Sequence, residues 1–144
     1  MKKFLLFGVL FVALLVTGCG NSGTKRLLCS QKVQTVDVNM IADFKGDELS
    51  YLGLKYEMDL SAYTDVQINA IKSQDMCSTV RTSMANYTDS FTNCKQSVEN
   101  KNLLITAGFD LDKLVGADIS RKTKITDAKE ELEKQNYSCT ISNR

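Results

Sequence analysis

Histidine, tryptophan and proline are all missing from this sequence of 144 residues. Without histidine the chain cannot form the Ser–His or Cys–His pairs that activate many enzymatic nucleophiles, and it offers no imidazole ligand to a metal. Charge of one sign is also scarce, because 18 basic and 17 acidic residues leave a net charge of +1. Binding to nucleic acid or to an anionic membrane face through overall charge relies on a positive excess that this chain lacks. The composition therefore excludes histidine-dependent catalysis and argues against a nucleic-acid partner.

The chain has no apolar run long enough to cross a bilayer as a helix. Its longest run, residues 4–16, has 13 residues, whereas a transmembrane helix needs about 20. Lys2 and Lys3 precede this run, and a short apolar segment after a cationic start is typical of a secretory signal peptide. The first residues therefore predict export of the protein.

The residues Val16, Thr17, Gly18 and Cys19 follow directly and resemble the lipobox of bacterial lipoproteins. The resemblance implies cleavage between Gly18 and Cys19 and the attachment of acyl chains, such as palmitate, to Cys19. Residues 1–18 are then a signal peptide, and residues 19–24 are a flexible tether because they are small and polar. Two alternatives remain: an ordinary signal peptide followed by an unrelated cysteine, or an uncleaved anchor.

Cleavage at this position leaves 126 residues, which is the size of one domain. We expect that domain to span residues 25–144. It contains four further cysteines, Cys29, Cys77, Cys94 and Cys139. Four cysteines in an exported domain indicate two disulfides, for which three pairings exist. We favour Cys29–Cys139, which would join the two ends of the domain, and Cys77–Cys94. The alternative is that one pair stays reduced.

Alternating polarity predicts several strands. In residues 35–44 the apolar side chains from Val36 to Phe44 share one face, with Ile41 as the exception, and Lys45-Gly46-Asp47 predicts a turn. Residues 52–60 alternate in the same way. Further strands are predicted at 27–31, 93–98, 103–109 and 137–141, with a turn at 99–102.

Two helices are predicted between these strands. Thr64 and Gln67 form a capping-box pattern at the start of a long helix that extends to about residue 87, with a break near Ser73. Thr126 is expected to cap a second, shorter helix, which Asn136 would end in a left-handed conformation. This order of elements predicts an α+β fold, in which two helices cover one face of an antiparallel sheet of five to six strands.

Candidate catalytic and metal-binding groups are few. Glu57 and Asp59 lie on one face of a predicted strand, at a spacing that a hydrolase with two carboxylates could use, although solvated strand faces commonly carry such pairs. Asp110, Asp112 and Asp118 resemble the ligands of a calcium loop, but Leu114 and Arg121 stand where such a loop needs oxygen ligands. The chain has no C-x-x-C motif for zinc. We therefore predict no metal site, no cofactor and no catalytic residues.

The layout resembles the small bacterial lipoproteins of the YehR type. The resemblance is carried by the hairpin around Lys45-Gly46-Asp47, the segment 109–114 (FDLDKL) and the ending 128–137 (AKEELEKQNY). It implies an α+β fold and a location in the cell envelope. This family has no established activity, so the resemblance assigns no functional residues.

We therefore expect a monomeric, lipid-anchored protein on the extracytoplasmic face of the cell membrane, or in the outer membrane if the cell is Gram-negative. Its acyl chains on Cys19 would contact the membrane, and its domain would bind an envelope protein or a small ligand. Two alternatives are a hydrolase that uses Glu57 and Asp59, and a purely structural or stress-related surface lipoprotein.

Overall fold

The fold was analysed in a computed structural model, which describes residues 23–84, 87–114 and 119–144. The predicted signal peptide, its cleavage site at Gly18 and the predicted lipidation site at Cys19 lie outside the described residues. The first element of the fold begins at Thr24, where the predicted tether ends.

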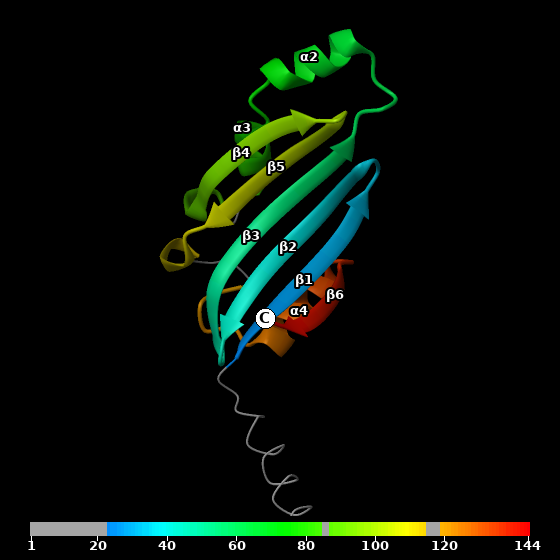
Figure 1. Cartoon of the computed structure of the whole chain (residues 1–144). Helices are drawn as coiled ribbons and strands as arrows, with labels where there is room; N and C mark the ends of the chain where they lie inside the picture. The colour runs from blue at the N-terminus through cyan, green and yellow to red at the C-terminus, as the bar shows by residue number, and fades with distance from the viewer. Residues whose placement is uncertain (1–22, 85–86, 115–118) are drawn as a thin grey trace, which may run out of the picture.

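Six strands form one antiparallel sheet in the spatial order β4-β5-β3-β2-β1-β6, and three helices pack against it (Figure 1). The strands are β1 (Thr24–Val33), β2 (Val36–Lys45), β3 (Glu48–Asp59), β4 (Phe91–Glu99), β5 (Asn102–Phe109) and β6 (Ser138–Asn143). The helices are α2 (Asp65–Ser73), α3 (Met76–Ser83) and α4 (Ile125–Lys134), and two short 3-10 turns lie at Thr88–Ser90 and Leu111–Lys113. The predicted α+β class is confirmed.

The predicted alternation of the central strands is confirmed by their burial. Val38, Met40, Ala42 and Phe44 of β2 point to the helix-covered face and are buried. The turn between β2 and β3 consists of Gly46 and Asp47, and Gly46 has a φ of +63°. Glycine suits this position because the left-handed region costs it little. The opposite face of the sheet, which Figure 1 turns toward the viewer, has no helix over it.

The predicted long helix is two helices, so the sheet carries three helices where the sequence predicted two. The break falls at Gln74, next to the predicted Ser73, because Gln74 has an extended backbone and the Asp75 side chain caps α3 by accepting from the backbone of Ser78. The predicted capping box is present, since Thr64 accepts from the backbone of Gln67 and the Gln67 side chain accepts from the backbone of Thr64.

The predicted start of the last helix is wrong by two residues. Helix α4 begins at Ile125, its N-cap is Lys124, and no side chain caps it. Thr126 therefore lies inside the first turn, where its hydroxyl contacts the Asp127 carboxylate. The predicted end is confirmed, because Asn136 has a φ of +68° and the chain then enters β6.

Two disulfides join distant parts of this fold, in the pairing that the sequence favoured. Cys29 in β1 is joined to Cys139 in β6, its direct neighbour in the strand register. Cys77 in α3 is joined to Cys94 in β4. Disulfides persist in oxidising compartments, so they indicate a domain that works outside the cytoplasm.

One hydrophobic core lies between the sheet and the helices. Its largest fully buried apolar side chains come from β1, β2, β3, the loop after β3 and the loop before α4: Leu27, Cys29, Phe44, Leu49, Leu52, Leu60 and Ile119. The segment from Gly23 onward thus contains the sheet, the three helices, both disulfides and this core, which is what an independently folding domain requires. Within the described ranges, no helix has the length and apolar character needed to span a bilayer.

Candidate functional site

An apolar cleft opens on the helix-covered face of the sheet, between α3 and the segment that joins α4 to β6. Its volume is about 440 Å³, which is within the range of about 300–1,000 Å³ typical of small-molecule sites. The floor is formed by the central strands, and the walls come from both sides. Its lining residues are Gln31, Val33, Gln34, Val36, Val38, Tyr56, Met58, Met76, Val80, Leu103, Ile105 and Tyr137.

The cleft exists because the helices cover different strands. Helix α3 packs against β4, and α4 packs against β6 and β1. The beginning of β2 and the end of β3 lie between α3 and α4, and neither helix covers them. Their alternating apolar side chains, Val36, Val38, Tyr56 and Met58, therefore become the cleft floor. Val36 and Met58 face each other in the strand register and are only partly buried.

The α3 wall of the cleft is fixed to the edge strand β4. The Gln96 side chain accepts a hydrogen bond from the backbone of Met76 (3.0 Å) and donates to the carbonyl of Gln74 (3.1 Å). The Cys77–Cys94 disulfide joins the same two elements. Because an isolated helix of eight residues is unstable in water, these links to β4 determine where Met76 and Val80 stand over the cleft.

The opposite wall is Tyr137, which directly precedes β6. Its backbone N–H donates to the carbonyl of Leu132 (3.1 Å), and Gln31 donates from its side chain to the carbonyl of Gln135 (3.2 Å). The Cys29–Cys139 disulfide fixes the start of β6 to β1. Each wall of the cleft is therefore held to the sheet by one disulfide.

No charged side chain is among the described residues that line the cleft. Burial raises the pKa of Tyr56 above its ordinary value of 10.0, and the Ser83 hydroxyl only partly opposes this. Burial also raises the pKa of Tyr137, and the proximity of Tyr56 adds to the effect. Both phenols are neutral at physiological pH, so the cleft offers an apolar surface with a few neutral hydrogen-bonding groups.

The structure does not bring the candidate carboxylates into this cleft. Glu57 and Asp59 lie on the uncovered face of the sheet, where the Lys55 ammonium is 3.1 Å from the Glu57 carboxylate. Asp59 accepts a hydrogen bond from the backbone of Ser61 (2.8 Å), and hydrogen bonding to Ser61 lowers the pKa of Asp59. Each carboxylate thus has its own local partner.

The uncovered face carries a second group of residues that the alternation of polarity did not single out. Asp43 belongs to the predicted polar face of β2, yet it is only 4 % exposed because Arg26 and Arg144 cover it. The register pairs Arg26 with Asp43 directly, whereas Arg144 is 101 residues away. No signal in the sequence predicts that second contact.

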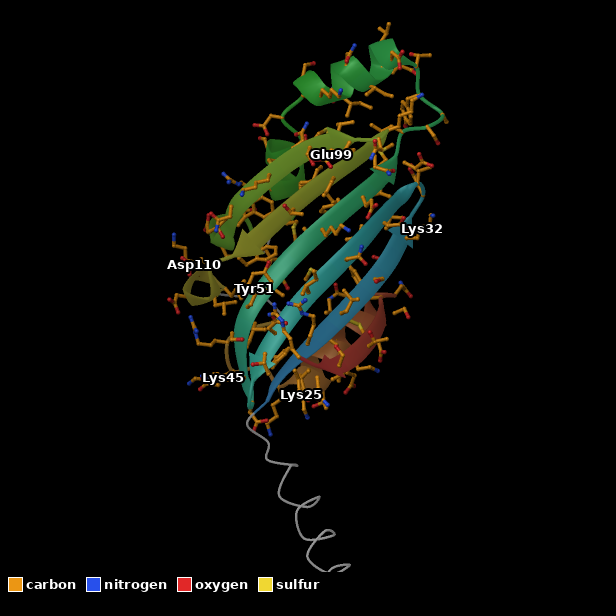
Figure 2. All side chains as sticks on the ribbon, in the orientation of Figure 1. Lys25, Lys32, Lys45, Tyr51, Glu99 and Asp110 are labelled. Carbon is orange, nitrogen blue, oxygen red and sulfur yellow. A yellow bond between two sulfur atoms is a disulfide. The ribbon has the colours of Figure 1, made fainter. Side chains whose placement is uncertain are left out.

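Tyr51, Tyr56 and Tyr63 do not gather into one groove. Tyr56 lines the cleft, Tyr51 lies on the uncovered face (Figure 2), and Tyr63 follows β3 in a loop. Within residues 23–84, 87–114 and 119–144, no group of three or more metal-ligating side chains comes together.

Comparison with protein-family models, with curated proteins and with solved structures finds no match to this chain. The resemblance to YehR-type lipoproteins therefore stays a prediction.

Proposed function

We propose that the protein is a lipid-anchored binding module of the cell envelope, whose apolar cleft binds a small, uncharged and largely apolar molecule. The cleft is the observation that carries this proposal. Its size, its apolar floor and its neutral polar groups are those of a ligand site, and an uncharged lining disfavours charged ligands because they would lose solvation without gaining a partner.

Three features support the location. The sequence resembles a lipobox at Cys19, the segment up to Thr24 has the composition of a tether, and the disulfides indicate an oxidising compartment. Acyl chains on Cys19 would place the domain on the extracytoplasmic face of a membrane.

The position of the cleft fits a ligand that arrives from outside this membrane. The cleft includes Val33, Gln34 and Val36, which surround the β1–β2 turn. That turn lies at the opposite end of β1 from Thr24, where the chain leaves the predicted anchor (Figure 1). Ten residues of strand span about 30 Å, so an anchored domain can hold the cleft well away from the bilayer surface.

Binding accounts for the geometry better than hydrolysis by Glu57 and Asp59. A pair of catalytic carboxylates acts across a bound substrate, but these two stand on the face opposite the cleft and neither is among the residues that line it. The proposal therefore contains no catalytic step. An Ala substitution at both positions should leave ligand binding unchanged.

A fluorescent probe tests the cleft directly. The uncharged apolar dye N-phenyl-1-naphthylamine should bind the oxidised domain saturably, with an increase in its fluorescence. Val36→Phe should fill the cleft and weaken the probe's affinity by about tenfold or more, which corresponds to about 1.4 kcal/mol. Met76→Trp fills the cleft from the α3 wall and should have the same effect, so the test does not depend on one variant folding correctly.

The matched control is Val66→Phe, which makes the same substitution on α2 at a side chain that is 80 % exposed. This variant should bind the probe like the original protein. Circular dichroism would verify that all variants fold. Equal affinities for the two Phe variants, or unsaturable fluorescence, would disprove a ligand site in the cleft.

The anchor is tested separately in cells. Cys19→Ala should remove the lipidation site and release the protein from the membrane fraction, and metabolic labelling with a fatty acid should mark the unchanged chain only. If the variant remains in the membrane fraction to the same extent, the proposed acyl anchor is wrong.

A further inference from the structure

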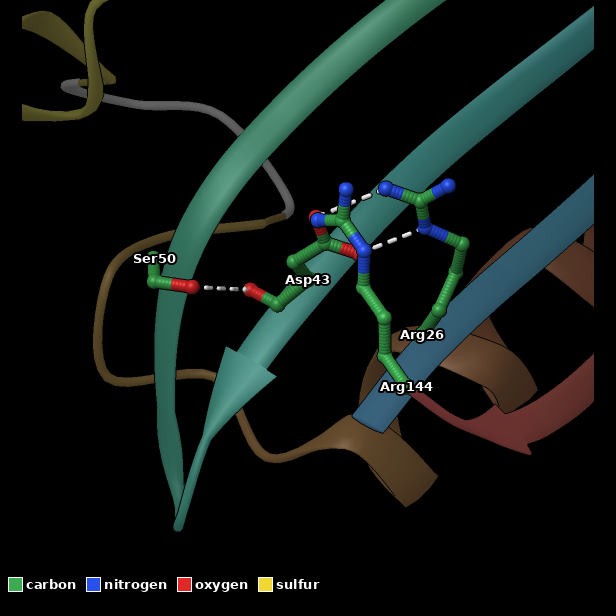
Figure 3. Close-up of polar contacts among 4 residues, drawn as sticks. All are labelled: Arg26, Asp43, Ser50 and Arg144. Carbon is green, nitrogen blue, oxygen red and sulfur yellow. Dashed lines mark hydrogen bonds and ion pairs between the residues drawn. The ribbon is translucent and has the colours of Figure 1, made fainter. Parts of the chain in front are cut away.

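Two arginines share one buried carboxylate on the uncovered face of the sheet (Figure 3). Arg26 donates from Nε to Asp43 Oδ1 (2.7 Å) and from Nη2 to Asp43 Oδ2 (2.9 Å). Arg144 donates from Nη1 to the same Oδ2 (2.6 Å). Ser50 donates from its hydroxyl to the backbone carbonyl of Asp43 (3.0 Å). Arg26 thus holds the Asp43 carboxylate at two points, and Arg144 joins the same carboxylate at one.

Among the side chains of this cluster, the two arginines carry one positive charge more than the Asp43 carboxylate neutralises. The two-point contact with Arg26 already satisfies and neutralises Asp43, and Arg144 adds a second cation. Arg144 is 58 % exposed and Arg26 is 33 % exposed. Their remaining N–H groups have no partner among the described residues, so they are available to an anion.

These N–H groups border a hollow of about 580 Å³, which we call the two-arginine hollow. Besides Asp43 and the two arginines, it is lined by Thr24, Ser50 and Tyr51, with Ile41 on its apolar side. Tyr51 lies along β3, where a side chain at Gly53 would collide with its phenol. Arginine forks match the geometry of phosphate oxygens, and the hollow has room for such a group.

The position of the hollow indicates where a phosphate would come from. Thr24, at the start of β1, is part of its lining and follows the predicted lipid-bearing Cys19 by five residues. An extended chain of five residues spans at most about 18 Å. The hollow therefore lies at the end of the domain that must stay close to the headgroups, while the apolar cleft lies at the other end.

We propose that the two-arginine hollow binds the phosphate group of an anionic phospholipid headgroup in the membrane that carries the protein. The hollow would thereby give the tethered domain a second, orienting contact with the bilayer, because acyl chains on one residue leave the domain free to rotate about its tether. The choice of a membrane phosphate rests on the proposed anchor, but the binding chemistry rests only on the described residues.

Vesicle binding of the domain from Gly23 to Arg144 tests the site without the acyl anchor. We expect the domain to bind vesicles that contain phosphatidylglycerol and to bind pure phosphatidylcholine vesicles much more weakly. Arg144→Gln should lower the affinity for the anionic vesicles by about fivefold, as for the loss of one basic residue at such a surface. Arg144→Lys, which keeps the charge but not the fork, should restore part of the affinity.

The matched control is Lys25→Gln, which removes one positive charge at the same end of the domain (Figure 2). Lys25 lies next to Arg26 but does not line the hollow. Its substitution should change the vesicle affinity much less than Arg144→Gln. Equal losses would show unspecific attraction by surface charge and would overturn the proposal, as would an affinity for anionic vesicles no greater than that for neutral ones.

Soluble glycerol 3-phosphate distinguishes the two sources of phosphate. We expect it to compete weakly with the anionic vesicles, with resonance shifts at the two arginines. Saturation of the hollow by the soluble compound, without vesicle binding, would show a site for a free phosphate and overturn the membrane assignment. Because the tested domain lacks Cys19, a negative vesicle result leaves the acyl anchor and the apolar cleft unaffected.

Discussion

Asp43 shows what a buried charge requires in this fold. It is the one charged residue among the buried side chains of the described segments, and it sits on the sheet face without helices. A carboxylate in such a place loses solvation unless cations and hydrogen bonds replace water. Arg26 and Arg144 supply both. At this point of the uncovered face, the backbone of β2 is therefore covered by an ion cluster and not by apolar side chains.

Replacement of Asp43 should expose this dependence. Asp43→Asn leaves two guanidinium groups side by side without their carboxylate, and we expect the free energy of unfolding to fall by about 1–3 kcal/mol, less than for a fully buried pair because both arginines reach solvent. Urea unfolding would measure the change. Asp37→Asn, at an exposed position of the same strand and face, is the control and should have almost no effect. Similar losses in both variants would contradict the assigned role.

The pH dependence of stability has a defined sign at Asp43. Its hydrogen bond with Arg26 is the main reason that the pKa of Asp43 lies below the ordinary value of 3.8 in the folded domain. The stabilisation is therefore complete above pH 3.8 and is lost as the pH falls through the lower, folded-state pKa. In urea unfolding at decreasing pH, the stability difference between the original domain and Asp43→Asn should shrink below about pH 4. A difference that stayed constant down to pH 2 would contradict this account.

Helix α2, which follows β3 in the chain, depends on its N-terminal cap. Thr64 and Gln67 satisfy each other's backbone N–H groups at the start of α2, and helix α2 buries only Ile68. With so little packing, we expect Thr64→Ala to cost about 1 kcal/mol in local or global stability. Hydrogen exchange of the α2 amides would detect the change. Thr64→Ser keeps the hydroxyl and should retain most of the protection.

The two disulfides should have different consequences when removed. Cys77 and Cys94 are 17 residues apart, and Cys29 and Cys139 are 110 apart, so loop closure predicts contributions of about 3 and 5 kcal/mol. Serine at Cys77 and Cys94 should release the α3 wall and weaken binding of the fluorescent probe, while the sheet stays folded. Serine at Cys29 and Cys139 should lower global stability more. An unchanged probe affinity without the Cys77–Cys94 bond would show that α3 is held by other contacts.

Local patterns in the sequence predict most of the elements but not the cleft. Alternating polarity predicts β2 and β3, and Gly46 predicts the turn between them. These predictions succeed because each signal depends only on residues that are close together in the sequence. The apolar residues Val36, Met58 and Met76 follow the same patterns as the core, and no local pattern states which part of a sheet lacks a helix above it. The start of α4 was predicted wrongly because Thr126 is a good capping residue, whereas the helix begins at Ile125 after Lys124 and has no side-chain cap.

The two proposed sites lie at opposite ends of the described sheet. The end at Thr24 holds the two-arginine hollow and the approach to the predicted anchor, and the end at the β1–β2 turn holds the cleft. The sheet between them is continuous, and the Cys29–Cys139 bond joins its last strand to β1. The proposed membrane contact and the proposed ligand site are therefore separate, and occupation of one would not require the other to open.

This arrangement predicts the orientation of the anchored protein. Lys45 pairs with Thr24 at the end next to the predicted anchor, whereas Lys32 lies eight residues further along β1 (Figure 2), a distance of about 26 Å. In the lipidated chain on vesicles that contain an acceptor-labelled lipid, energy transfer from a fluorophore at residue 45 should clearly exceed that from one at residue 32. Arg144→Gln should reduce the contrast, because the tether alone does not orient the domain. Equal transfer from both positions in the unchanged chain would mean that the domain lies flat or rotates freely, and the cleft would then not be held away from the bilayer.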